Sequence, residues 1–478
     1  MPCFARAAAA LTALLVCVFA VSPAEASAPP PEPSVEVTLR PAGDGEWIAD
    51  YRFRRPAPAW VFRRSATTEE ENLPWRPRSW TVETRGVRLE RRGAHDVLTA
   101  GGRPLTRVRV RIKPFGEPLR ADYVPVLHFT DGGRAHFVGQ YAVAPLVSAA
   151  QAETLPSDLN VAALEDAPGR FTIRSREPML LDGRVFQGRV ETDFSRDRYV
   201  YVGRTPLTET EVIAVVADPG LPPWLRAEID RLGPLLLAEH ARRLGPRTGG
   251  RPTVYAGWGG AETPGVSFNG GALSGLIVLN MRGAQATRPL PALVDLMRWF
   301  VGHEAAHFWA GQEVRTGRAA DAWITEGGAD LLAVRAIQAI EPAFGAKARL
   351  QASVDECLAL TGPGEALAGA AERSEHRASY ACGALLLLAA EAGLRRGDPS
   401  ADAAVFWRGL IERNRSDGVV ESEEWLAAFA EATGDPALTA EVRAFVENGV
   451  DDPRAFLQRL FTAVGVQHRT EGERILLG

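Results

Sequence analysis

The chain has 478 residues, 46% of them hydrophobic and 24% charged, with a net charge of −5 and a pI near 6.0. This slightly acidic balance excludes the basic surface of a nucleic-acid-binding protein, so we expect no nucleic acid partner. The length is sufficient for two or three domains with substantial hydrophobic cores.

The first 28 residues have the pattern of a secretory signal peptide. Arg6 precedes an apolar run over residues 7–21, and small residues at 24 and 26, or at 26 and 28, provide a cleavage site. The run is too short for a membrane span, and no later stretch approaches 18 apolar residues. We therefore expect an exported protein, periplasmic or secreted, without a membrane span in its mature form.

Residues 29–34, which follow the signal peptide, are rich in proline and are expected to form a tether. Once the signal peptide is removed, Cys357 and Cys382 are the remaining cysteines. Export to an oxidising compartment permits a disulfide between them. Two buried free thiols fit the sequence equally well, because two cysteines are too few to indicate a disulfide framework.

Residues 35–205 show the alternation of apolar and polar side chains that is typical of strands with one solvated face. In one such run Arg107, Arg109 and Arg111 alternate with apolar residues. These arginines could form a basic patch, but the solvated face of a single strand is the favoured interpretation. Clusters of glycine and proline separate the runs, which predicts a β-sandwich-like domain.

Residues 206–345 mix strand and helix patterns. Apolar runs at 212–216, 252–255 and 275–280 indicate buried strands, and residues 224–243 indicate a helix with His240 at a surface or packing position. Another helical run follows from Leu290. A mixed sheet followed by helices is typical of an α+β catalytic domain.

Residues 346–478 are almost entirely helical in pattern. Ser422 is a candidate N-cap, with Glu423 and Glu424 favourably placed in the first turn after it. We expect a C-terminal helical bundle, so the whole chain is predicted to be an α+β multidomain protein. The expected helices of this region span 379–394, 422–433, 437–448 and 452–464.

The helical run after Leu290 contains His303, Glu304 and His307 in the order H-E-x-x-H, a metallopeptidase signature. Residues four apart lie one turn apart on one face of a helix, so both imidazoles can reach a single ion. The alternative is a solvated helix that carries two histidines and a glutamate by chance.

A catalytic zinc site typically has three protein ligands and keeps one position for water. Glu326, with 18 residues between it and His307, is the natural third ligand. Asp330 lies one turn beyond Glu326 and is a candidate hydrogen-bond partner for a liganding imidazole. Glu304 directly follows a ligand, so its carboxylate is placed to act as general base on the activated water. An oxyanion donor is also needed, and spacing alone does not choose among Tyr380, His376 and Arg377.

The segments 303–311 and 323–329 resemble the aminopeptidase N family and the related glycyl aminopeptidases. Those families share H-E-x-x-H, the same spacing to a Glu, a Trp two residues after the second His, and a W-x-x-E-G segment, all of which occur here. The resemblance implies a thermolysin-like catalytic domain of the gluzincin type that acts on peptide or protein substrates. It also implies one zinc ion per chain on His303, His307 and Glu326, with Glu304 as general base.

The same families carry a Y-x-x-G-A segment on a downstream helix, whose Tyr stabilises the oxyanion. Residues 380–384 match this segment, which implies that role for Tyr380, with Cys382 where Lys is usual. The helical tail, notably residues 425–434, resembles the glycyl aminopeptidases, without the PDZ domain that is frequent in them.

Exopeptidases of these families also have a glycine-led strand segment whose Glu binds the substrate's free amine. The best match is residues 270–274, which implies substrate contacts for Gly271, Ala272 and Ser274 and puts Ser274 in place of the Glu. A hydroxyl group cannot neutralise an ammonium ion. We therefore predict an aminopeptidase-like zinc metallopeptidase that uses another acid or does not require a free amino terminus.

Two alternatives remain at this point. A non-catalytic zinc-binding scaffold would explain why both Ser274 and Cys382 depart from the family pattern. Hydrolysis of a non-peptide substrate is the other alternative, since relatives of this fold open epoxides. The sequence leaves the oligomeric state open.

Overall fold

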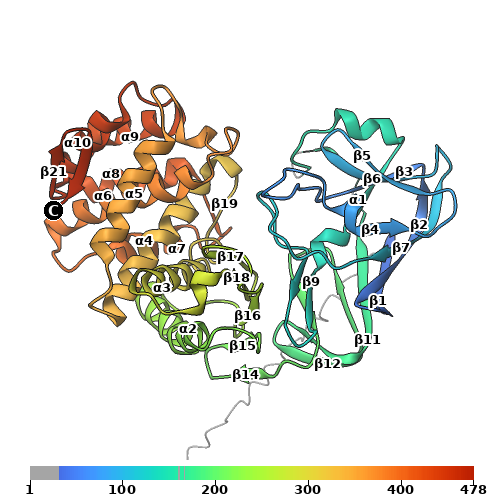
Figure 1. The fold of residues 1–478 in the computed structure, drawn as a ribbon. Coiled ribbons are helices and arrows are strands. Elements are labelled where there is room, and N and C mark those ends of the chain that lie inside the picture. Colours follow the sequence, from blue (N-terminus) through green and yellow to red (C-terminus); the bar gives the residue numbers. More distant parts are fainter. Residues whose placement is uncertain (1–31, 160–161, 166) are drawn as a thin grey trace, which may run out of the picture. The chain divides into compact units, whose positions relative to one another are not determined.

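The computed structural model describes residues 32–159, 162–165 and 167–478. The predicted signal peptide and residues 29–31 of the predicted tether lie outside these residues. The fold is of the mixed α+β type, with a β-rich N-terminal region in blue to cyan and a helical C-terminal region in orange to red (Figure 1). Among the described residues, no helix is long and apolar enough to cross a bilayer.

The N-terminal region contains a nine-stranded sheet in the order β4-β7-β2-β1-β11-β13-β9-β8, with β12 paired to β11. Strand β1 runs parallel to β11 and antiparallel to β2, so the first strand joins two distant parts of the chain. The strands are β1 (Val35–Gly43), β2 (Glu46–Ala57), β4 (Trp80–Val82), β7 (Leu105–Ile112), β8 (Val126–His128), β9 (Arg134–Phe137), β11 (Gly169–Leu181), β12 (Arg184–Asp193) and β13 (Tyr199–Val202).

A four-stranded sheet packs on the nine-stranded sheet to form the predicted sandwich. Its order is β10-β3-β6-β5, with strands β3 (Ala59–Phe62), β5 (Arg88–Arg92), β6 (His95–Thr99) and β10 (Val143–Leu146). Side chains of both sheets share one core, in which the rings of Phe53 and Trp60 stack 4.2 Å apart. On the outer face, Arg109 pairs with Asp50 and Arg111 pairs with Glu83, which fits a solvated strand face.

A five-stranded sheet follows, in the order β14-β15-β16-β18-β17. The three inner strands are parallel, and both edge strands are antiparallel to their neighbours. Among the strands of the described residues, β18 alone pairs with β17, so one hydrogen-bonding edge of β17 has no strand partner there. The bounds are β14 (Leu207–Glu209), β15 (Ala214–Ala217), β16 (Thr253–Trp258), β17 (Ser267–Leu273) and β18 (Leu276–Arg282).

Nine long helices pack beside this sheet within the described residues, and one continuous hydrophobic core runs from Ile213 to Leu477. The helices that follow residue 345 share this core with the sheet. The helices are α2 (Pro223–Leu244), α3 (Pro291–Ala306), α4 (Ala322–Ile340), α5 (Ala346–Leu360), α6 (Arg377–Gly397), α7 (Ala403–Arg413), α8 (Ser422–Thr433), α9 (Pro436–Glu447) and α10 (Pro453–Val464).

One local prediction for this region was wrong. Ser422 is the first residue of α8 and not its N-cap: its hydroxyl donates to Asp321 over 2.5 Å, and Glu421 caps the helix. The backbone N–H of Glu421 donates to Glu424 over 2.8 Å, as in a capping box. The chain after α10, for which no helix was expected, forms a hairpin of β21 (His468–Glu471) and β22 (Arg474–Leu477).

The N-terminal region contacts the five-stranded sheet through a shared hydrophobic cluster. In this cluster Leu127, Phe129 and Tyr201 pack with Tyr255 and Leu273. The backbone N–H of Thr130 donates to Asp218 over 3.0 Å, and Arg282 pairs with Glu117 over 2.6 Å. These contacts matter for the site, because they hold the β7–β8 loop of the N-terminal region against the edge strand β17.

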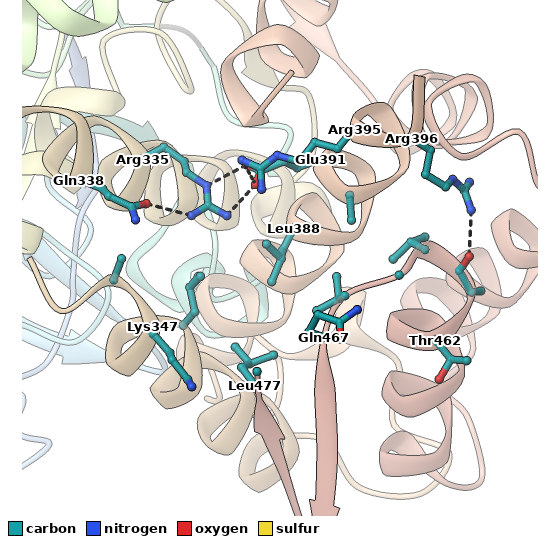
Figure 2. A pocket seen from close by; sticks show the side chains of 18 residues that line it. Arg335, Gln338, Lys347, Leu388, Glu391, Arg395, Arg396, Thr462, Gln467 and Leu477 are labelled. Carbon is teal, nitrogen blue, oxygen red and sulfur yellow. Dashed lines mark hydrogen bonds and ion pairs between the residues drawn. The ribbon is translucent and has the colours of Figure 1, made fainter. Parts of the chain in front are cut away.

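A groove between α4, α5, α6, α10 and the terminal hairpin is lined by cations that hold the helices together (Figure 2). Glu391 is fully buried and accepts hydrogen bonds from Arg335 over 2.6 and 2.9 Å, and Arg395 lies 3.0 Å from it. Arg396 donates to backbone carbonyls at the C-terminal ends of α8 and α10, where a positive charge is favourable.

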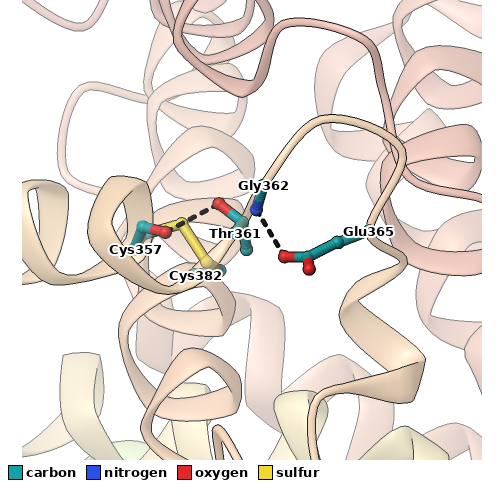
Figure 3. Close-up of a disulfide and its surroundings, with 5 residues drawn as sticks. All are labelled: Cys357, Thr361, Gly362, Glu365 and Cys382. Atoms are coloured by element: carbon teal, nitrogen blue, oxygen red, sulfur yellow. Dashed lines mark hydrogen bonds between the residues drawn. A yellow bond between two sulfur atoms is a disulfide. The ribbon is translucent and has the colours of Figure 1, made fainter. Parts of the chain in front are cut away.

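Cys357 on α5 and Cys382 on α6 form a disulfide, with a sequence separation of 25 residues (Figure 3). Both residues are almost fully buried. The Thr361 hydroxyl donates to the Cys357 carbonyl over 2.7 Å and closes the end of α5 beside the bridge. Of the two arrangements that the sequence allowed, the structure has the bonded one.

Candidate active site

The H-E-x-x-H segment lies at the C-terminal end of α3. The helix begins with Pro291, which suits a first helical position, and it ends at Ala306. His307 is the next residue, and its Nδ1 donates to the Ala310 carbonyl over 2.8 Å. Close packing of α3 on α4 is possible because Gly302 has no side chain: a Cβ there would lie 2.9 Å from Ile337. The spacing therefore places His303 and His307 on the face that looks toward α4.

Glu326 on α4 completes a group of three potential metal ligands. The Nε2 atoms of His303 and His307 lie 2.9 Å apart, and Glu326 Oε2 lies 3.4 and 3.3 Å from them. Three ligands at about 2.0–2.1 Å from a tetrahedral zinc ion are separated by about 3.3 Å, so this group fits zinc. In the described part of the chain it is the single cluster of His, Cys, Asp and Glu with this property.

Asp330 orients His303 from behind. The Nδ1 atom of His303 donates to Asp330 Oδ1 over 2.7 Å, and both residues are buried. Burial alone would lower the pKa of His303, but hydrogen bonds to Asp330 and Glu326 raise it to about 10. Surroundings that favour a positive charge this strongly also favour a bound cation. The Arg349 guanidinium lies 3.9 Å from the second Asp330 oxygen and stacks on Trp299.

Glu304 is buried beside the two imidazoles, with 5% of its surface exposed. Burial raises the pKa of its carboxyl group, and the neighbouring histidines offset this only in part. Within the described part of the chain, its Oε2 atom has no hydrogen-bond partner. A buried carboxylate oxygen without a partner in a pocket is suited to bind and deprotonate a water molecule.

Tyr380 enters the site from α6, and its ring stacks on His303 with centroids 5.3 Å apart. Burial raises the pKa of this phenol well above its usual range, and Glu326 and Glu304 act in the same direction. The phenol therefore keeps its proton at neutral pH and can donate a hydrogen bond.

Two glycines allow α6 to approach α4 this closely. A Cβ on Gly383 would lie 2.1 Å from the Trp323 carbonyl, and a Cβ on Gly327 would lie 2.2 Å from the Gly383 backbone. The helices therefore cross with their backbones in contact, one residue after Glu326 and three residues after Tyr380.

These side chains line one pocket of about 490 Å³. Gly271 and Ala272 on β17, for which we expected substrate contacts, are among its lining residues, together with Asn269 and Gly270. Ser274 was misplaced: it does not line the pocket but is exposed in the β17–β18 turn. His376, another candidate for the oxyanion donor, is exposed and precedes α6.

Sequence reasoning missed several residues that help to form the pocket, among them Asp122, Tyr123 and Gln312. Asp122 and Tyr123 come from the loop after β7 in the N-terminal region, and no local pattern connects them with the site. Gln312 follows the H-E-x-x-H segment, and its side chain donates to the Leu273 carbonyl over 2.7 Å and accepts from the Gly275 N–H. The one sequence feature that could have pointed to Gln312 as a pocket residue is its position soon after His307.

Comparison by sequence finds no match to a protein-family model or to a curated protein. Comparison of structures finds an M1 zinc metallopeptidase from Deinococcus radiodurans bound to a Tyr-Ser-Ala substrate, with a TM-score of 0.50 and 16% identity. This match covers 88% of the present chain and 94% of the other. A yeast LTA4 hydrolase in complex with bestatin matches at a TM-score of 0.49 and 12% identity, over 88% and 68% of the two chains.

The chain therefore has the fold of the gluzincin zinc metallopeptidases of the M1 type. The predicted likeness to that group is confirmed at the level of the fold. The predicted α+β architecture, with an N-terminal β-rich region and a C-terminal helical region, is confirmed as well.

Proposed function

We propose that the chain is a zinc-dependent metallopeptidase that hydrolyses peptide bonds, with Glu304 as general base. The observation that carries this proposal is that one pocket contains side chains suited to three tasks: binding a metal ion, accepting a proton from water and donating a hydrogen bond to an oxyanion. The pocket contains the His303, His307 and Glu326 ligand group, the Glu304 carboxylate and the Tyr380 phenol. The likeness in fold to M1 zinc metallopeptidases supports it.

Each residue has a defined task in this mechanism. A zinc ion on His303, His307 and Glu326 would polarise the substrate carbonyl and lower the pKa of a water molecule. Glu304 takes the proton from the attacking water and later gives it to the leaving amine, which suits a carboxyl group whose pKa is raised by burial. Tyr380 donates a hydrogen bond to the oxyanion of the tetrahedral intermediate.

Substitution of Glu304→Gln in the zinc-loaded full-length protein tests the proposal. We expect peptide hydrolysis to fall by about 10²–10⁴-fold, with one zinc ion per chain retained. Glu313→Gln is a matched control, because Glu313 accepts its hydrogen bonds from Thr248 outside the pocket. Undiminished hydrolysis by Glu304→Gln with zinc still bound would exclude this mechanism.

A non-catalytic zinc-binding scaffold is the alternative function. It was suggested by two departures from the family pattern, Ser274 and Cys382. The second departure has another explanation, because Cys382 forms the disulfide with Cys357. A broad peptide screen of the wild type separates the two functions. Stoichiometric zinc without cleavage of any peptide would favour the scaffold.

We also propose that the protein is exported, to the periplasm or the medium. The buried disulfide supports this proposal, because disulfides form and persist in oxidising compartments. Cell fractionation and N-terminal sequencing of the protein purified from its host would test it. A full-length protein confined to the cytoplasm would contradict it.

A further inference from the structure

Arg377, one of the three side chains that the sequence offered as oxyanion donor, is not among the residues that line the pocket. It lies instead against the ring of Tyr380, one turn further along α6, with its guanidinium carbon 4.5 Å from the ring centroid. A guanidinium over an aromatic face is attracted by the charge distribution of the ring. Arg377 therefore contacts the proposed oxyanion donor without facing the pocket itself.

A bidentate ion pair fixes the guanidinium of Arg377. Its Nε and one terminal nitrogen donate to the two carboxylate oxygens of Glu356 over 3.0 and 2.9 Å. Two parallel bonds of this kind determine the orientation of a guanidinium as well as its position. Glu356 belongs to α5, so a second helix determines where the side chain of Arg377 lies on α6.

The disulfide joins the same two helices beside this ion pair. Cys357 directly follows Glu356, and Cys382 lies two residues beyond Tyr380. Helix α5 is therefore fixed on α6 close to the phenol by a covalent bond as well as by an ion pair. This arrangement gives Arg377 a firm base from which to hold a neighbouring ring.

The ring of Tyr380 depends on its neighbours for its orientation because it borders the open pocket. Its stacked contact with His303, with centroids 5.3 Å apart, supports the ring but leaves it free to slide. An oxyanion donor must lie about 2.7–3.1 Å from the oxygen that develops charge. A displacement of about 1 Å can therefore cost about 10²-fold in rate.

We propose that Arg377 is a positioning residue for Tyr380: held by Glu356, it keeps the phenol in the orientation from which its hydroxyl reaches the oxyanion. This inference rests on the peptidase function proposed above. It gives Arg377 no contact with the substrate, so loss of its guanidinium should slow the reaction and leave substrate binding unchanged.

Arg377→Met in the zinc-loaded full-length protein tests the inference, because methionine keeps an unbranched stem but has neither charge nor hydrogen-bond donor. We expect kcat on a single peptide to fall by about tenfold, with unchanged KM and one zinc ion per chain. Arg443→Met is the matched control. Arg443 forms a bidentate pair with Glu423 between α9 and α8, and neither residue lines the pocket, so kcat should stay at the wild-type value.

A double-mutant cycle with Tyr380→Phe separates positioning from a general loss of structure. If Arg377 acts through the hydroxyl of Tyr380, its effect should disappear once that hydroxyl is removed. The variant with both substitutions should then have the same kcat as Tyr380→Phe alone. An equal fall of kcat in both backgrounds would indicate a loosened pocket and would overturn the inference.

Arg377→Lys keeps the inference testable if Arg377→Met does not fold. Lysine retains a charge beside the ring but binds Glu356 as a point charge and not with a planar fork. We expect kcat to fall by about threefold, again only while the Tyr380 hydroxyl is present. A folded, zinc-containing variant with the wild-type kcat, or with a raised KM alone, would overturn the inference.

The activity of the wild type distinguishes failure of this inference from failure of the proposed function. A wild type that cleaves no peptide contradicts the proposed function, and the inference fails with it. An active wild type whose kcat is matched by folded Arg377→Met contradicts the inference alone.

Discussion

The imidazole of His303 donates a hydrogen bond from Nδ1 to a carboxylate oxygen of Asp330 over 2.7 Å, in a position from which water is almost excluded. A proton on Nδ1 leaves Nε2, the atom that faces His307 and Glu326, free to bind a metal ion. Asp330 therefore sets both the tautomer and the orientation of a candidate metal ligand without belonging to the ligand group itself.

Asp330→Asn should weaken zinc binding by about 10–100-fold, because an amide is a poorer partner for the imidazole than a carboxylate. Competition with a chromophoric chelator measures the zinc affinity directly. Circular dichroism controls for unfolding. An unchanged zinc affinity in the folded variant would show that Asp330 does not support the metal site.

Tyr380→Phe should lower kcat by about 10²–10³-fold and change KM little, because the hydroxyl acts on charge that develops only in the transition state. The phenylalanine ring can still stack on His303, so zinc content should stay the same. Steady-state kinetics on a single peptide would check this. A rise in KM at constant kcat would instead indicate that Tyr380 binds the substrate's ground state.

His240 should make the protein less stable in mild acid. It is buried against Trp309, and burial, with help from Arg243, lowers the pKa of its ring to about 4. The unfolded chain takes up a proton at about pH 6.5, whereas the folded chain does not until about pH 4. Stability is therefore lost as the pH falls through 6.5, by about 2 kcal/mol at pH 5.

Urea denaturation of wild type and His240→Phe at pH 7.5 and pH 5 measures this difference. The variant keeps an aromatic ring but has no titrating group, so its loss of stability between the two pH values should be smaller by about 2 kcal/mol. The comparison uses the change in the free energy of unfolding between the two pH values. A packing defect that lowers the stability of the variant equally at both pH values therefore does not affect the result. Equal losses in both proteins would assign the acid sensitivity to other groups.

Removal of the disulfide should lower the free energy of unfolding by about 3 kcal/mol, as expected for closure of a loop of 25 residues. The double variant Cys357→Ser, Cys382→Ser would show the loss in urea denaturation without reductant. Wild type in reductant should approach the same value, while the double variant should not respond to reductant. A wild type that is equally stable with and without reductant would contradict a stabilising role.

The parts of the fold and site that could be predicted depend on residues that lie close together in the sequence. His303 and His307 are one turn apart, and Glu326 and Asp330 lie on a single helix with a clear apolar pattern, so their spacing was sufficient to group them. Helix α8 was predicted with the bounds that the structure has. In these cases short-range geometry determines the result.

The parts that could not be predicted depend on contacts between distant segments. Tyr123 meets Gly271 because a hydrophobic cluster holds the N-terminal region on the five-stranded sheet, and nothing in the sequence near either residue encodes that contact. The pairing of β1 with β11 is of the same kind. Ser274 shows a different failure, since the family resemblance put it at the substrate, whereas it lies in the exposed turn that follows strand β17.

The contact between Gly327 and Gly383 gives one structural reason for the glycine in both motifs. W-x-x-E-G and Y-x-x-G-A occur far apart in the sequence, but each supplies one side of a single helix crossing, and neither glycine has room for a methyl group. A chain that lost its zinc chemistry would still need both glycines to pack these helices. The motif pair is thus a signature of how two helices meet, whereas the proposed catalysis depends on His303, Glu304, His307, Glu326 and Tyr380.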